Sequence, residues 1–135
     1  SALKPTEQLE HIEGIIDGFR AAGLEIAADL PETYEAPALT QLALVRIISE
    51  GLTNALRHQG PGTHVEVELA LADAARITLT STNPSPTPSE VTGSGVGLIG
   101  VEERAHALGG RLECSGDATK FILRAELPLW KESRA

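Results

Sequence analysis

A change of hydrophobic period after residue 58 is the feature that most constrains the fold of this chain. Residues 38–58 repeat apolar side chains at helical spacing, and one side of this predicted helix carries Leu44, Ile48, Leu52, Ala55 and Leu56. After a Gly-Pro-Gly turn, residues 64–71 and 76–80 alternate apolar and polar side chains, which predicts a β-hairpin joined by 72–75. A long amphipathic helix can bury its apolar side against such a hairpin, so the pattern favours a helical layer on a β-sheet.

The remaining segments complete an α/β pattern. Helices are predicted at 6–22 and 98–108, and strands at 24–28, 111–115 and 120–127. Residues 83–97 are rich in proline and glycine and are expected to form an exposed loop. Because neighbouring strands form hairpins, we expect a mixed, mostly antiparallel sheet covered by helices on one face, which is a two-layer α/β sandwich. The length predicts a single domain over residues 1–135.

Composition narrows the possible partners. The net charge is −8, which disfavours a basic patch that could bind nucleic acid. Aromatic residues make up 3% of the chain, which leaves few side chains on which bases could stack. We therefore expect no nucleic-acid partner. The single cysteine, Cys114, excludes an internal disulfide, agrees with a reducing compartment and is expected to be a small core residue.

The sequence carries no membrane signal. It has neither a signal peptide nor an apolar run approaching the roughly 20 residues of a membrane-spanning helix. We expect a cytoplasmic domain that makes no membrane contact of its own. Because the sequence contains no methionine, we expect it to be part of a longer protein, whose other parts could include membrane segments or partner domains.

Glu50, Asn54 and His58 are spaced four residues apart on the predicted helix 38–58. Glu50, Asn54 and Arg57 lie roughly opposite its apolar side. Carboxylate and amide oxygens suit a hydrated divalent cation such as Mg²⁺, and a carboxylate one turn away can also orient a water or act as a base. Arg57 and His58 could reach phosphates, although the helix dipole alone favours cations there. The alternative interpretation is an ordinary solvated helix face.

A glycine-rich segment at 93–100 precedes the predicted helix 98–108. Alternating glycines let the backbone approach an anion closely, and the helix that begins near Leu98 adds its N-terminal dipole. No Lys-Ser or Lys-Thr follows, so the segment is not a Walker A loop, and no strand precedes it as a dinucleotide fingerprint requires. The alternative interpretation is a flexible surface loop. Together with Glu50 and Asn54, the segment indicates a magnesium–nucleotide site.

Asn83 ends the second strand of the predicted hairpin. A side-chain amide can accept a hydrogen bond from the amino group of adenine and donate one to the neighbouring ring nitrogen. The alternative interpretation is an ordinary Asn-Pro turn.

These motifs resemble those of a known family. Residues 46–58 resemble the N box of histidine-kinase ATP-binding domains, and residues 93–110 resemble their G2 box and the helix that follows. The string Gly-Leu-Ile-Gly-Val-Glu-Glu-Arg at 97–104 is similar to the nitrate-sensor class of bacterial sensor kinases, especially the actinobacterial ones. The likeness extends over residues 12–128. It implies the Bergerat (GHKL) ATPase fold and a catalytic domain that binds ATP and Mg²⁺.

The resemblance also implies roles for individual residues. Asn54 would be the Mg²⁺ ligand and Glu50 the catalytic carboxylate. The remaining nucleotide contacts would come from Arg57 and His58 near the phosphates, Gly93, Gly95, Gly97 and Leu98 at the lid hinge, Asn83 at the usual position of an adenine-binding aspartate, and Thr119 in support of the adenine site.

The implied reaction is transfer of the γ-phosphate of ATP to a histidine on a separate dimerisation domain of a homodimer, for relay to a response regulator. No phosphoacceptor segment is recognisable in this sequence, so residues 1–22 are expected to be a linker and first helix that follow the missing dimerisation domain.

The chain departs from the family pattern at residues 82–86, which read Thr-Asn-Pro-Ser-Pro where the usual box is Asp-x-Gly-x-Gly. Val96 also replaces a frequent histidine. Two alternatives therefore stay open: a degenerate nucleotide-sensing or interaction module without turnover, and an anti-sigma-type protein-serine kinase on the same fold.

Overall fold

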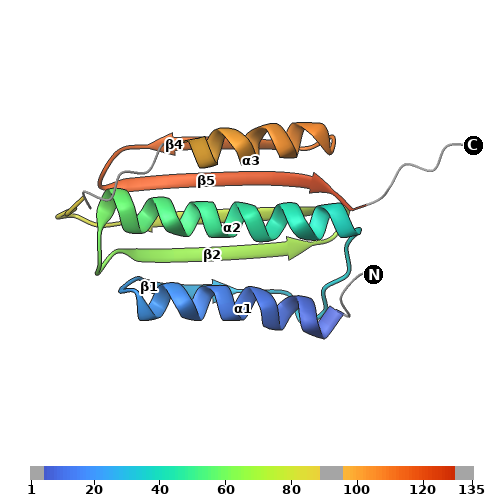
Figure 1. Ribbon diagram of the computed structural model, residues 1–135, viewed down its shortest axis with the longest axis horizontal. Helices are drawn as coiled ribbons and strands as arrows, with labels where there is room; N and C mark the ends of the chain where they lie inside the picture. The colour runs from blue at the N-terminus through green and yellow to red at the C-terminus, as the bar shows by residue number, and fades with distance from the viewer. Residues whose placement is uncertain (1–4, 89–95, 130–135) are drawn as a thin grey trace, which may run out of the picture.

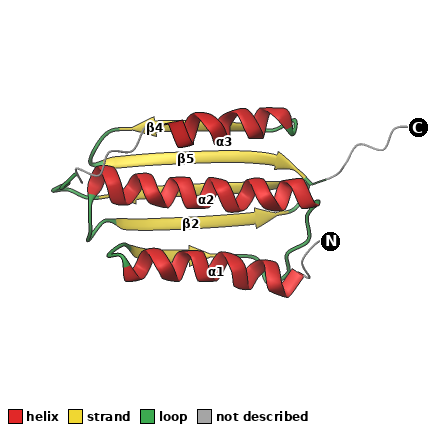
Figure 2. Cartoon of the chain, in the orientation of Figure 1, coloured by secondary structure: helices red, strands yellow, loops and turns green. Residues whose placement is uncertain are grey.

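Three helices cover one face of a five-stranded sheet in the computed structural model, which describes residues 5–88 and 96–129 (Figures 1 and 2). The elements, in chain order, are α1 (Pro5–Ala21), β1 (Glu25–Asp29), α2 (Ala38–Gln59), β2 (His64–Leu71), β3 (Ala74–Thr82), α3 (Val96–Ala107), β4 (Arg111–Gly116) and β5 (Lys120–Pro128). This arrangement confirms the predicted two-layer α/β sandwich. Within the described ranges, no helix is long and apolar enough to cross a membrane.

The sheet is mixed, as predicted, with the strand order β1-β2-β3-β5-β4. β1 pairs with β2 in parallel, and the other three pairings are antiparallel. The parallel pair is possible because α2 lies between the two strands in sequence and returns the chain to the start of β2. β3 is longer at both ends than the predicted 76–80, because its pairing with β5 extends from Ala74 to Thr82.

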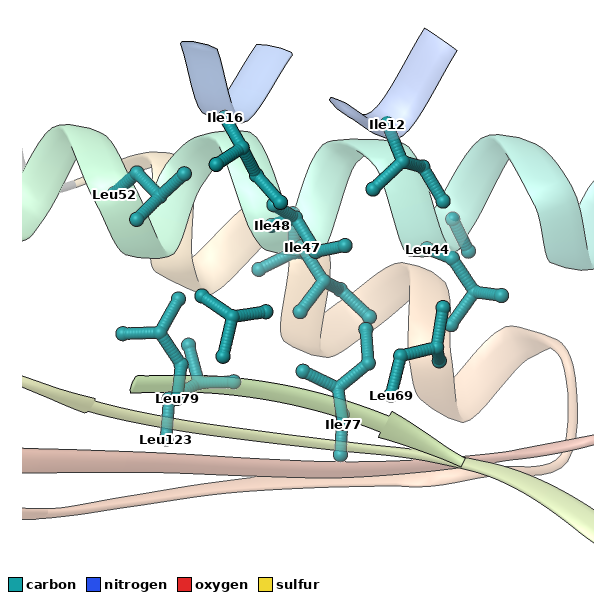
Figure 3. Packing of buried hydrophobic residues seen from close by; sticks show 14 of the residues in the cluster. Ile12, Ile16, Leu44, Ile47, Ile48, Leu52, Leu69, Ile77, Leu79 and Leu123 are labelled. Carbon is teal, nitrogen blue, oxygen red and sulfur yellow. The ribbon is translucent and has the colours of Figure 1, made fainter. Parts of the chain in front are cut away.

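The core lies between the helices and the inner face of the sheet (Figure 3). Leu44, Ile48 and Leu52 of α2 are fully buried, which confirms the apolar side predicted for this helix. They pack between Ile12 and Ile16 of α1 and the aliphatic side chains of the sheet (Figure 3). The core therefore holds α2 rigidly against the sheet and fixes where its polar residues lie.

The prediction that Cys114 is a core residue is wrong, because its side chain is exposed. β4 is the last strand in the sheet order and pairs only with β5. Of its residues, Leu112 alone is buried. An edge strand has a neighbour on one side only, so an inward-facing residue there can still reach solvent.

Candidate nucleotide site

A cavity of about 440 Å³ lies at the C-terminal end of α2. Its walls come from α2, the end of β3, the start of α3 and the turn between β4 and β5, and they include Asn54, His58, Gln59, Ser81, Leu98, Asp117 and Phe121. Ligand cavities in proteins are commonly roughly 300–1,000 Å³. The volume therefore suits a small organic ligand.

Two motifs that are distant in sequence meet at this cavity. Asn54 and His58 of the central helix line it together with Leu98 of α3. Gly97, in the first turn of α3, lies against the carboxylate of Glu50, since a Cβ added at Gly97 would meet that group. The structure thus brings the predicted metal-binding face of α2 next to the end of the glycine segment. Gly93 and Gly95 lie outside the described residues.

Asn54 is buried, with 6% of its surface exposed, so the alternative interpretation of a solvated helix face does not hold for this residue. α3 packs beside α2, its Val101 and Ala105 are buried, and its Leu98 lines the same cavity as Asn54. The Asn54 amide nitrogen donates to the backbone carbonyl of Glu50 across 2.9 Å. Its Oδ1 accepts from Arg57 at 3.4 Å. A buried, doubly held amide presents its oxygen in a fixed direction.

The two cationic candidates at the end of α2 differ in position. The side chain of His58 is exposed and lines the cavity. Arg57 is half-buried, is directed to Asn54 Oδ1, and is absent from the cavity wall. Both lie in the last turn of α2, where the helix dipole favours positive charge.

Asn83 lies behind the cavity wall rather than in it. Its Nδ2 donates to the backbone carbonyl of Gln59 at 2.8 Å and to Thr63 Oγ1 at 3.1 Å, and its Oδ1 accepts from the Ser85 N–H at 2.9 Å. Both amide N–H groups are therefore taken up by the protein. The predicted contact of Asn83 with adenine stays a prediction.

Thr119 is exposed, and its hydroxyl donates to Asp117 Oδ1 at 2.8 Å. The backbone carbonyl of Thr119 accepts from the N–H of Asn83 at 2.9 Å. This hydrogen bond links Asn83, the residue predicted to contact adenine, to the turn between β4 and β5. The hydrogen bond from the Thr119 hydroxyl, together with the N–H groups of Thr119 and Lys120, holds the pKa of Asp117 below its usual range. Asp117 lines the cavity, so a fixed carboxylate lies in its wall.

Gln59 and Asp117 are among the cavity residues that the sequence interpretation missed. Gln59 follows His58 directly and has 2% of its surface exposed, and Asp117 sits in the last turn of the sheet. A Gly-Asp pair between two predicted strands signals a turn. No local pattern indicates that this turn comes close to the end of α2, because the contact depends on the sheet order.

A metal ion would find few protein ligands here. Within residues 5–88 and 96–129, no three His, Cys, Asp or Glu side chains are grouped so that they could hold one. Mg²⁺ commonly takes one or two protein ligands and completes its shell with waters and substrate phosphates. The single amide oxygen of Asn54 beside an open cavity fits that pattern.

A model of one protein family matches residues 40–130, the family described as histidine kinase-, DNA gyrase B- and HSP90-like ATPases. The chain belongs to this ATPase family. The matched range contains α2 from Thr40 onward, all of α3 and the whole cavity wall named above. None of the curated proteins matches the chain in sequence.

Solved structures of histidine kinases share the fold of this ATPase domain. The histidine kinase domain of a blue-light-activated kinase from Erythrobacter litoralis has a TM-score of 0.70 at 20% identity, covering 96% of this chain and 66% of the other. A mycobacterial sensor histidine kinase, MprB, has a TM-score of 0.68 at 20% identity, covering 89% and 94%. Histidine kinase ThkA in complex with the response regulator TrrA has a TM-score of 0.68 at 13% identity, covering 95% and 41%.

The chain thus spans about two thirds or less of two of these three structures. At these identities the likeness extends to the fold alone. A histidine-kinase-type ATPase catalytic fold is therefore what the chain has in common with them.

Proposed function

We propose that this domain binds ATP and is the catalytic part of a sensor histidine kinase. One observation carries the proposal: Asn54 and Leu98 line the same cavity, while Gly97 lies against Glu50. A buried amide oxygen, a carboxylate and the first turn of a helix are the groups that a metal–triphosphate requires. The family match over residues 40–130 supports the same ligand.

Each residue of the site has a proposed part. Asn54 is the residue that would hold Mg²⁺, which when bound neutralises charge on the phosphate oxygens. His58 and Arg57 contribute positive charge near the phosphates, and the N-terminal turn of α3, with Gly97 and Leu98, donates backbone N–H groups. Gly93, Gly95, Asn83 and Thr119 complete the proposed nucleotide contacts.

The proposed reaction transfers the γ-phosphoryl group to a histidine outside this domain. The acceptor imidazole nitrogen forms the new bond to the γ-phosphorus, the bond to the bridging oxygen breaks, and ADP leaves with the electron pair. Glu50 accepts a hydrogen bond from the other ring N–H of the acceptor and so keeps its nucleophilic nitrogen free. Positioning and charge neutralisation supply most of the rate enhancement.

The proposed partners follow from this reaction. The acceptor histidine belongs to a dimerisation domain of the same homodimeric protein, with residues 1–22 as the connection, and a response regulator receives the phosphoryl group. The complex of ThkA with its response regulator supports this partnership for a protein of the same fold. We propose further that the protein belongs to the nitrate-sensor class, is actinobacterial, and keeps this domain in the cytoplasm.

Titration of the domain with ATP, with and without Mg²⁺, tests the proposal. We expect binding that strengthens with Mg²⁺ in the wild type, and loss of the Mg²⁺-dependent part in Asn54→Ala. Gln41→Ala is the control, because Gln41 donates to Ala36 at the far end of the same helix. Equal Mg²⁺ dependence in wild type and Asn54→Ala would contradict the proposal.

One observation favours a second candidate, a nucleotide-sensing module without turnover. Both N–H groups of Asn83, at the usual position of the adenine-binding aspartate, are bonded within the protein. Phosphorylation of an added histidine-bearing dimerisation domain separates the two. A module without turnover would bind ATP and leave that domain unlabelled.

A further inference from the structure

Gln59, the last residue of α2, carries a buried acceptor that has no partner among the described residues. Its Nε2 donates to the backbone carbonyls of Ala118 at 3.1 Å and Ser81 at 3.3 Å. Carbonyl oxygens only accept hydrogen bonds, so the side-chain nitrogen of Gln59 must face these two carbonyls and Oε1 must point away from them. Within the described residues Oε1 is buried and has no hydrogen-bond partner.

An unsatisfied buried acceptor is unusual in a native protein and indicates a missing donor. Gln59 belongs to the wall of the 440 Å³ cavity, together with Ser81 and Ala118, whose carbonyls it binds. The missing donor can therefore belong to a ligand of this cavity. A donor-only group such as an aromatic amine satisfies an amide oxygen without placing a second acceptor against it.

The position of Gln59 suits one end of a nucleotide. It follows Asn54 by five residues on the same helix, which corresponds to roughly 7.5 Å along the axis. Asn54 marks the proposed phosphate end of the cavity, and the carbonyls of Ser81 and Ala118 mark the other end. A base bound there would reach Gln59 while the phosphates reach the start of α3.

Asn83 explains why Gln59 is held in this place. Its amide donates to the backbone carbonyl of Gln59, which a carboxylate at position 83 could not do. An asparagine here thus secures the residue whose side chain lies in the cavity wall. The asparagine that replaces the family's usual aspartate is thus hydrogen-bonded to the residue that lines the cavity, and the two residues act together.

We propose that Gln59 Oε1 accepts the hydrogen bond of the exocyclic amino group of the bound adenine, so that Gln59 selects the base and Asn83 positions Gln59. This inference rests on the proposed binding of ATP. It assigns base selection to a residue that the sequence interpretation did not name.

The test compares ATP with purine riboside triphosphate, which carries hydrogen in place of the amino group. Both are titrated with Mg²⁺ by calorimetry or by displacement of a fluorescent nucleotide. We expect wild type to bind ATP about tenfold more tightly, a difference of about 1.4 kcal/mol. Equal affinities for the two nucleotides overturn the inference and leave ATP binding intact. Failure of both to bind folded protein overturns the proposed function as well.

Substitutions locate the preference. In Gln59→Met we expect the ratio of the two affinities to fall to about one, even if both affinities decrease because the bonds to Ser81 and Ala118 are lost. Gln41→Met, the same change on the same helix away from the cavity, should keep the tenfold ratio. A preference that survives in Gln59→Met but disappears in Asn83→Ala overturns the inference.

A measurement on wild type covers the case in which Gln59→Met does not fold. The side-chain amide resonances of Gln59 should shift when ATP binds and much less when purine riboside triphosphate binds. Equal shifts with both nucleotides overturn the inference.

Discussion

Gly97 in the first turn of α3 leaves room for the carboxylate of Glu50, which occupies the space where a Cβ on Gly97 would lie. Gly97 is half-buried, and its neighbour Leu98 lines the cavity. The start of α3 and the polar side of α2 are thus fitted to each other at the site. Any side chain at position 97 must move either Glu50 or the first turn of α3.

Gly97→Ala should therefore weaken ATP binding. We expect a destabilisation of about 1–3 kcal/mol from overpacking and a decrease in affinity of about tenfold. Gly100→Ala in the same helix is the control, because a Cβ there meets no atom of the described residues within 4 Å. Calorimetric titration and urea unfolding measure both effects. Wild-type affinity in Gly97→Ala would show that the contact with Glu50 is unimportant for the site.

Gly51→Ala should destabilise the core beneath the site. A Cβ at Gly51 would lie 2.7 Å from Leu79 Cδ1, whose side chain is fully buried in the sheet. We expect the free energy of unfolding to fall by about 1–3 kcal/mol. A Cβ at Gly18 on α1 meets nothing within 4 Å in the described part of the chain. In Gly18→Ala the higher helix propensity of alanine should therefore raise the free energy of unfolding by about 0.5–1 kcal/mol. Urea unfolding with equal midpoints for the two variants would contradict this expectation.

Asn83→Asp restores the family's usual residue type and should nevertheless destabilise this domain. The carboxylate cannot donate to the Gln59 carbonyl or to Thr63 Oγ1, and the residue is 9% exposed. The Gln59 carbonyl keeps the Thr87 N–H as a donor at 2.9 Å, so the cost, about 1–3 kcal/mol, comes from a buried carboxylate that faces two acceptors. Thermal unfolding at neutral pH measures the loss. A higher melting temperature would mean that the two bonds donated by the Asn83 amide do not stabilise the fold.

The titration of Asp117 should depend on Thr119. The Thr119 hydroxyl is the largest cause of the lowered pKa of Asp117, so Thr119→Val should raise that pKa toward its usual value. Since the folded-state pKa lies below the unfolded one, the stabilisation is present above about pH 4 and is lost as the pH falls through the folded pKa. An NMR titration of the Asp117 carboxyl carbon measures both proteins. Identical titration curves would exclude the hydroxyl as the cause.

Local periodicity was sufficient for the elements that form the core. The predicted strand 64–71 coincides with β2, and the predicted helix 38–58 differs from α2 by one residue, because alternation and helical spacing report directly on burial. Asn54 shows the limit of this reasoning. Periodicity considers one helix at a time, so the burial of this polar residue by other parts of the chain has no local signal.

The site itself was predicted in part. Asn54, His58 and Leu98 were named from sequence and lie in the cavity wall. Gln59 was missed because its neighbours Ser81 and Ala118 are far away in the chain and come close to it only through the pairing of β3 with β5. The prediction that Cys114 is a core residue failed for a similar reason, since the strand order, which places β4 at the edge of the sheet, has no local signal.

The order of the elements also sets the direction from which the cavity can be approached. α1 begins and β5 ends at one end of the molecule, whereas α2 ends, next to the cavity, at the opposite end (Figure 1). An affinity tag or a surface tether joined to the start of α1 or to the end of β5 therefore starts from the side away from the cavity. Immobilised protein should bind nucleotide as freely as protein in solution, whichever of these two positions carries the anchor.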